Sequence, residues 1–186
     1  MRQIAWDTET TLIGPGQIAP KLICLSLAWR EDGETVTELY TNSDPEELKK
    51  VLLWLFTNEE VAPITHNGAF DYAVVAAAFP ELLPVIFDLL ESGRATDTLW
   101  REKLLNVSDH GRLDMRPIVG GGAAPLRYSL AALVEQYLGL DISESKKADA
   151  WRLHYALLDG WSKDEYPQAA AAYAREDAAH TLSVFM

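Results

Sequence analysis

The sequence is short of cysteine, because Cys24 is the only one among 186 residues. A single cysteine makes neither an internal disulfide nor a zinc cluster, which excludes small disulfide-rich domains and cysteine-based zinc domains. It also favours a reducing, cytoplasmic setting. Cys24 lies within the apolar run from Leu22 to Ala28, so we expect it to be a small buried hydrophobic residue.

Long apolar runs are also lacking. No run approaches the roughly 20 residues of a membrane-spanning helix, so we expect no membrane partner. The first ten residues, MRQIAWDTET, turn acidic too early for a secretory signal. Hydrophobic residues make up 48% of the chain, a proportion typical of a globular domain.

Basic residues are few. Lys and Arg number 16 against 28 Asp and Glu, which gives a formal net charge of −12. Such a charge argues against a protein that coats nucleic acid through its overall field. It is compatible with an enzyme that gathers carboxylates to hold divalent cations, since bound metals reverse the charge locally.

The order of the expected elements indicates an α/β fold. Apolar runs and alternating patterns predict strands over 3–6, 21–30, 34–40 and 61–65, the second and third paired antiparallel. Helical periodicity and cap residues predict helices from 45, over 70–79, from about 97, over 129–138 and over 164–185. The Gly-rich segment 107–127 is expected to be a long loop. Strands first and helices later predict a mixed central sheet flanked by helices on both faces.

Candidate metal ligands occur in three segments. Asp7 and Glu9 follow a short apolar strand two residues apart, so their side chains leave the same face. Asp71 opens a helix directly after a buried strand and an Asn-Gly turn. Tyr173 and Asp177 are spaced i and i+4, one turn apart on one helical face. Taken alone, each segment also has a structural explanation. Asp7 and Glu9 are compatible with a solvated strand end, and Asp71 with an acid in the first turn of a helix. Tyr173 and Asp177 are compatible with an unrelated pair near the surface.

Together these side chains permit metal-assisted hydrolysis. Two cations about 4 Å apart can hold a scissile phosphate, lower the pKa of an attacking water and stabilise the departing oxygen. Oxygen ligands suit Mg²⁺ or Mn²⁺ better than zinc. A tyrosine hydroxyl, with an ordinary pKa of about 10, can orient the water but is a poor base at neutral pH.

The three segments resemble the exonuclease motifs of the DnaQ-like (DEDD) superfamily, which has a ribonuclease H-like fold. They read Asp7-Thr8-Glu9, Asn67-x-x-x-Asp71 and Tyr173-x-x-x-Asp177, in this order over nearly the whole chain. The last motif is similar to that of the tyrosine subclass, because the histidine subclass would carry its His where this chain has Ala172. The segments 96–99 and 128–139 also resemble proofreading domains of family-A DNA polymerases, including phage-type ones.

The resemblance implies roles for single residues. Asp7, Glu9 and Asp177 would bind the tighter metal, Asp7 would be shared with the second, and Asp71 would act on that second metal. Tyr173 would orient the nucleophile. Contacts to the terminal nucleotide would come from Thr8, Asn67, Phe70 and either Leu12 or Ile13, the last two as a wedge against the base.

The resemblance also implies a substrate and a setting. The expected function is removal of 5′-mononucleotides from 3′ ends of single-stranded DNA, in proofreading. The alternatives are an RNase D-like 3′–5′ exoribonuclease and a catalytically silent nucleic-acid-binding module. Residues 1–186 are expected to form one exonuclease domain, either a fragment of a larger DNA polymerase or a small free-standing nuclease. The expected partner is a polymerase domain in cis or trans. For a phage-encoded chain the compartment would be the host cytoplasm.

Two further groups of residues are candidates for contacts with nucleic acid. The basic ones are Arg112, Arg116, Arg127, Lys146, Lys147 and Arg152, of which about a third are expected to touch the phosphate backbone. The other group is the six tryptophans, most of which are expected in the core rather than at base-stacking positions.

Overall fold

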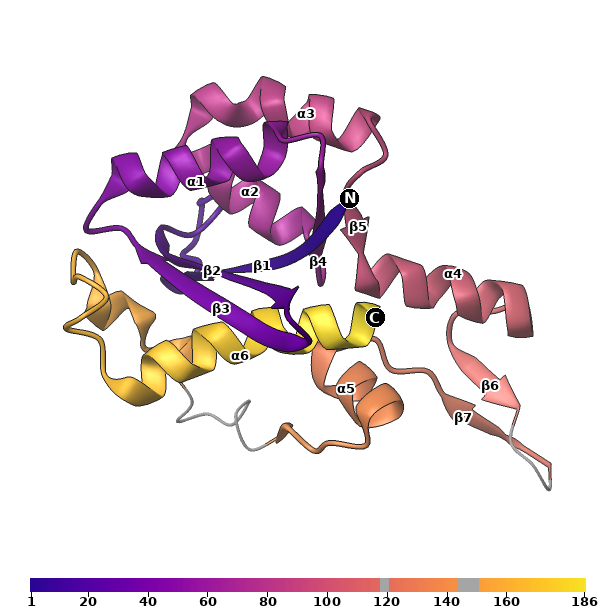
Figure 1. Ribbon diagram of the computed structural model, residues 1–186. Coiled ribbons are helices and arrows are strands. Elements are labelled where there is room, and N and C mark those ends of the chain that lie inside the picture. Colours follow the sequence, from indigo (N-terminus) through magenta and orange to yellow (C-terminus); the bar gives the residue numbers. More distant parts are fainter. Residues whose placement is uncertain (118–120, 144–150) are drawn as a thin grey trace.

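A computed structural model describes residues 1–117, 121–143 and 151–186. Its centre is a mixed sheet of five strands, with helices above and below it (Figure 1). The strand order is β3-β2-β1-β4-β5. β1 pairs antiparallel with β2 and parallel with β4, which confirms the expected mixed sheet. The strands are β1 (Arg2–Thr10), β2 (Leu22–Glu31), β3 (Glu34–Thr41), β4 (Val61–Thr65) and β5 (Thr96–Asp97).

Helices cover both faces of the sheet, as expected (Figure 1). One face carries α1 (Pro45–Thr57), α2 (Ala69–Ala78), the short η1 (Pro80–Leu82) and α3 (Leu83–Glu91). The other carries α5 (Leu130–Leu138), η3 (Trp151–Leu153), η4 (Tyr155–Leu158) and α6 (Gln168–Phe185). α4 (Thr98–His110) projects away from the sheet. None of these helices combines the length and apolar character needed to cross a membrane.

Alternation along β1 divides the core into two parts. Ile4 and Trp6 point toward α1–α3, where the Trp6 ring meets Phe56 and Tyr72 edge-on at centroid distances of 5.4 and 5.1 Å. Ala5, between them, belongs to the cluster formed with α6. Because side chains alternate along a strand, the odd-numbered Asp7 and Glu9 continue on the α6 side.

Small side chains bring α6 close to the sheet. Ala170, Ala174 and Ala178 are fully buried against the central strands. Alanine at every fourth position makes one face of the helix shallow, so the helix backbone approaches β1 and β2 closely. Tyr173 and Asp177 lie on this helix and are therefore carried to the carboxyl end of β1.

The expected long loop over 107–127 is partly wrong. α4 continues to His110, and a small hairpin follows, formed by β6 (Met115–Pro117) and β7 (Ala123–Pro125). Strands of three residues are too short to show an alternating pattern, so the hairpin cannot be predicted from the sequence. Gly120, part of the glycine run in that segment, lies outside the described residues.

The turn between β4 and α2 is held in a tight conformation. Asn67 has a left-handed φ of 63°, a region that Asn tolerates better than most residues. Its amide and that of Gly68 donate to the Asp97 carboxylate at 3.1 and 2.8 Å. A Cβ atom on Gly68 would lie 2.2 Å from Thr65 Oγ1. The turn therefore needs glycine at this position because of close packing.

We predict that Gly68→Ala lowers the free energy of unfolding by about 1–3 kcal/mol, the usual range for overpacking. Thr65 is buried on β4 and cannot swing away. The matched control is Gly14→Ala, where the added Cβ would meet only the flexible Gln17 side chain at 3.4 Å. Urea unfolding of both variants checks this, and equal stabilities would contradict it.

Candidate active site

Three carboxylates converge where β1 meets α6. Single ligand oxygens of Asp7, Glu9 and Asp177 all lie within 4.8 Å of one another. Glu9 is buried, with 7% of its surface exposed, and the other two are half-buried. Oxygen atoms at this spacing can share one divalent cation. The donor set therefore fits Mg²⁺ or Mn²⁺.

The local fold explains why these three meet. Asp7 and Glu9 face Ser26 and Cys24 across the antiparallel pair of β1 and β2. The register shifts directly after Glu9, and such irregularities commonly redirect a strand beside an active site. Burial raises the pKa of the Cys24 thiol, and the nearby Glu9 charge raises it further. Cys24 therefore stays a neutral, buried neighbour of the site, as expected.

Asp71 stands apart from this cluster and contacts β1 from the α2 side. Its Oδ1 accepts hydrogen bonds from the Thr8 amide at 3.0 Å and from the Thr8 hydroxyl at 2.6 Å. Thr8 is even-numbered on β1, so it faces away from Asp7 and Glu9. Burial raises the pKa of Asp71 to about 7, although the bonds from Thr8 lower it. Asp71 is thus a carboxyl whose charged form needs further stabilisation.

Tyr173 is a buried phenol on the same helix as Asp177. Burial and the negative charges of Asp177, Glu9 and Asp7 raise its pKa well above the ordinary value, and Arg152 opposes this. Its ring packs against Tyr155 at a centroid distance of 6.3 Å. The hydroxyl therefore keeps its proton at neutral pH and can donate a hydrogen bond to an oxygen atom.

An open pocket of about 650 Å³ adjoins these groups. Its wall combines three of the expected site residues, Asp7, Tyr173 and Asp177, with a fourth, Asn67. The pocket is large enough for a nucleotide, since ligand sites commonly measure about 300–1,000 Å³. The remaining lining residues are His66, Leu99, Tyr128, Ser129, Leu130, Ala131 and Arg152.

The other expected substrate contacts lie outside the wall of this pocket. Leu12 and Ile13 follow β1 and are 63% and 59% exposed. Phe70, at the start of α2, is 41% exposed. Thr8 is buried and engaged with Asp71. Among the basic candidates, Arg152 lines the pocket, whereas Lys146 and Lys147 lie outside the described residues.

Asp97 positions two walls of the pocket, a role that the sequence did not reveal. Its carboxylate accepts from the amides of Asn67 and Gly68 before α2 and from those of Leu99 and Trp100 in α4. Asn67 and Leu99 both line the pocket. In the sequence, the segment 96–99 predicts a helix start near Asp97 and resembles proofreading domains, and neither pattern points to these contacts.

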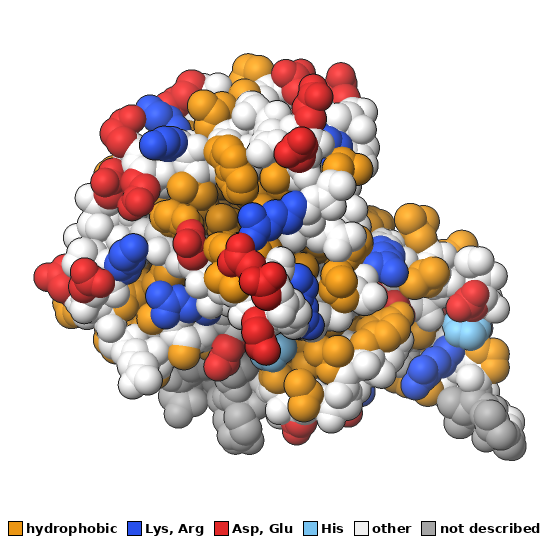
Figure 2. Space-filling view, viewed as in Figure 1, with side chains coloured by type: hydrophobic (Ala, Val, Ile, Leu, Met, Phe, Trp, Pro, Cys, Tyr) orange, Lys and Arg blue, Asp and Glu red, His pale blue; other side chains and the backbone are white. Residues whose placement is uncertain are grey.

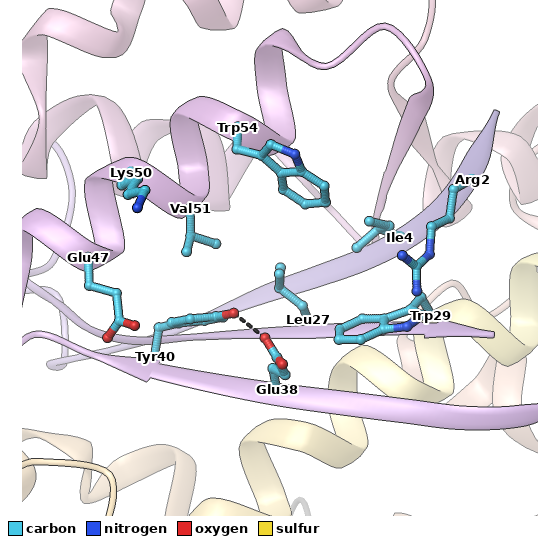
Figure 3. A pocket seen from close by; sticks show the side chains of 10 residues that line it. All are labelled: Arg2, Ile4, Leu27, Trp29, Glu38, Tyr40, Glu47, Lys50, Val51 and Trp54. Atoms are coloured by element: carbon cyan, nitrogen blue, oxygen red, sulfur yellow. Dashed lines mark hydrogen bonds between the residues drawn. The ribbon is translucent and has the colours of Figure 1, made fainter. Parts of the chain in front are cut away.

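A second, smaller pocket of about 370 Å³ lies on the α1 face of the sheet (Figure 3). The side chains of Trp29, Tyr40 and Trp54 surround it, and Tyr40 donates a hydrogen bond to Glu38. Its ten lining residues include none of the four acids expected to bind metal. Of the two pockets, only the one on the α6 side is lined by acids of the expected metal-binding set, Asp7 and Asp177.

Comparison with protein families gives a clear result. The model of the 3′–5′ exonuclease family matches residues 1–186. The chain belongs to the 3′–5′ exonuclease family. The enzyme is therefore a nuclease of the hydrolase class that acts on nucleic acid. No curated protein sequence matched it.

Solved structures share the ribonuclease H-like fold of this exonuclease. The Nibbler exonuclease domain of Aedes aegypti has a TM-score of 0.63 at 16% identity, covering 98% of this chain and 75% of that one. RNase D of Escherichia coli has 0.56 at 23%, covering 98% and 37%. RNase D of Trypanosoma brucei, in complex with RNA U12, has 0.63 at 15%, covering 98% and 54%.

We predict that Asp71→Asn stabilises the metal-free enzyme at pH 8 but not at pH 4. The folded pKa of about 7 exceeds the unfolded value of about 3.9, so the folded state holds an extra proton between them. The contribution of this extra proton to the free energy of unfolding is fully present below about pH 4, and it is lost as the pH rises through 7. Asparagine stays neutral throughout.

Thermal unfolding in excess chelator at both pH values measures this difference. The control is Asp88→Asn, at an exposed position on α3, which should show no such dependence. An Asp71→Asn variant that is less stable than wild type at pH 8 would refute the ionisation argument.

Proposed function

We propose that this exonuclease releases 5′-mononucleotides from the 3′ end of single-stranded DNA by two-metal-ion hydrolysis. The observation that carries the proposal is the convergence of Asp7, Glu9 and Asp177 within 4.8 Å beside a nucleotide-sized pocket. Membership of the 3′–5′ exonuclease family supplies the direction of attack. Convergent carboxylates without cations would repel one another, so the arrangement supports metal binding.

The donor set supports two cation positions, for Mg²⁺ or Mn²⁺. Asp7, Glu9 and Asp177 would hold the first, and Asp7 together with Asp71 would hold the second. Since Asp71 is not part of the close cluster, it would act through water. When bound, the cations supply an activated water and stabilise the departing 3′ oxygen.

The remaining residues would orient the substrate. Tyr173 keeps its proton, so its hydroxyl would donate a hydrogen bond that aims the attacking water. Arg152 faces the same pocket and offers a positive charge to the scissile phosphate. Asn67, which also lines the pocket, would contact the terminal nucleotide, and exposed Leu12 or Ile13 would press on its base.

The choice of DNA rests on the matched family model, which describes exonucleases of the DNA polymerase A type. Proofreading, a polymerase domain in cis or trans and a cytoplasmic setting are parts of the same proposal. RNA is the second candidate substrate, because the structural neighbours include RNase D of Escherichia coli, described as an exoribonuclease involved in structured RNA processing. Parallel digestion of matched DNA and RNA oligonucleotides distinguishes the two, and preference for RNA would overturn the DNA assignment.

We predict that the double variant Asp7→Asn/Glu9→Gln releases mononucleotides at least about a thousandfold more slowly than wild type. The change removes the negative charge of two cation ligands but keeps their shape. Excess chelator should abolish the wild-type activity to the same extent. Labelled single-stranded DNA with Mg²⁺ or Mn²⁺ gives the rates, and digestion by the double variant at the wild-type rate would show that the site is wrongly assigned.

Tyr173→Phe serves as the comparison for this double variant. It removes only the hydroxyl, so we expect a rate about tenfold below wild type, because one positioning hydrogen bond of about 1–1.5 kcal/mol is lost. Binding of Mn²⁺, measured by calorimetry, should remain close to wild type. In the double variant, by contrast, that binding should be lost.

A further inference from the structure

A projecting arm extends from one wall of the active-site pocket. We define it as residues 98–117 and 121–127, which comprise α4 and the β6–β7 hairpin (Figure 1). Leu99, at the base of the arm, lines the pocket. Tyr128, the residue directly after it, lines the pocket as well and donates a hydrogen bond to the Leu113 carbonyl at 2.9 Å. The arm is thus continuous with the site.

The arm differs in charge from the rest of the chain. Positions 98–127 carry five Lys or Arg and three Asp or Glu, whereas the remaining positions carry 11 and 25. One of the three acids, Glu102, is buried and held by Tyr137, Gln136 and Asn106. A polyanion that is repelled by most of this surface would therefore find weaker repulsion, and local attraction, along the arm.

Aromatic rings and an ammonium group meet at the base of the arm. Lys103 Nζ lies 4.4 Å from the centroid of the Trp100 ring and 5.6 Å from that of Tyr128. Trp100 is 55% exposed. Within the described part of the chain, no carboxylate forms an ion pair with Lys103. Figure 2 shows apolar and basic side chains gathered over this projecting part of the molecule.

We propose that Trp100, Lys103 and Tyr128 form a strand-binding platform for the single-stranded nucleic acid that leads into the pocket. The two rings stack on bases that lie a few nucleotides 5′ of the scissile bond, and the ammonium group neutralises a phosphate between them. This combination of aromatic faces and positive charge is how proteins bind single strands without reading their sequence. The inference rests on the proposed function, since it names where the substrate of that site continues.

Charge and continuity favour a nucleic acid over a protein as the occupant. Trp100, Leu104 and Val107 are exposed on one helical face, which alone would suit either partner. The arm carries five basic residues against three acids, a balance that suits a polyanion better than the rest of the chain does. Arg112 and Arg127 pair with Asp114 and Glu135, which leaves Lys103 as the cation beside the exposed rings. Tyr128 belongs both to the platform and to the wall of the pocket that Asp7 and Asp177 also line. The two binding surfaces are therefore continuous, and a strand held in the pocket can extend directly onto the platform.

The test is the dependence of hydrolysis on substrate length. The ratio of kcat/KM for a 12-mer to that for a 3-mer of single-stranded DNA should fall about tenfold in Trp100→Ala, because stacking on one ring is lost. Trp100→Phe keeps an aromatic face and should restore most of the ratio. Trp54→Ala is the matched control, a 42% exposed tryptophan on α1, and should keep the wild-type ratio.

Binding separates failure of the platform from failure of the proposed function. Fluorescence anisotropy of a labelled 12-mer with Ca²⁺ should show about tenfold weaker binding for Trp100→Ala. For Lys103→Gln, the slope of log K against log salt should be smaller by about 0.7, the value for one phosphate contact on a single strand. If wild type hydrolyses no DNA, the proposed function fails, and binding alone decides the platform. Equal ratios and equal binding in all variants would overturn the platform and leave this face to a protein partner.

Discussion

Repulsion among three carboxylates is the constraint on which the rest of the structure depends. Oxygens of Asp7, Glu9 and Asp177 lie within 4.8 Å of one another. At an effective dielectric constant of 20, two ionised carboxylates at such a distance repel by about 3–4 kcal/mol. A divalent cation among them replaces this repulsion with attraction. The site is therefore expected to be less stable without metal. In the metal-free protein, the packing of the surrounding fold must hold the acids together against their repulsion.

Two simple periodicities hold them there. The two-residue repeat of β1 places Asp7 and Glu9 toward α6 and places Thr8 toward α2, where it binds Asp71. The alanines of α6 let that helix lie close enough to bring Asp177 to the strand. Asp97 then fixes the turn before α2 against the first turn of α4. These contacts set β1, α2, α6 and the base of the projecting arm relative to one another.

The sheet, most of the helices and the family could be predicted from the sequence, because each rests on a local pattern. β2 can be recognised as one apolar run. The family can be recognised because the three acidic motifs occur with the spacing and in the order that the DnaQ-like exonucleases show. The hairpin after α4 escaped prediction, since strands of three residues show no period. The prediction that most tryptophans lie in the core is also wrong. Trp6 is buried as expected, but Trp54, Trp100 and Trp161 are 42%, 55% and 44% exposed, because exposure depends on which tertiary neighbours cover a ring. The role of Asp97 required knowledge of residues 30 positions away.

The most direct test of the central claim is anomalous diffraction from crystals of the wild-type protein soaked in Mn²⁺. We expect a peak bounded by carboxylate oxygens of Asp7, Glu9 and Asp177, with Asp71 near a second peak once a nucleotide is bound. Crystals that show no manganese at these three carboxylates, or show it only elsewhere, would refute the proposed metal site.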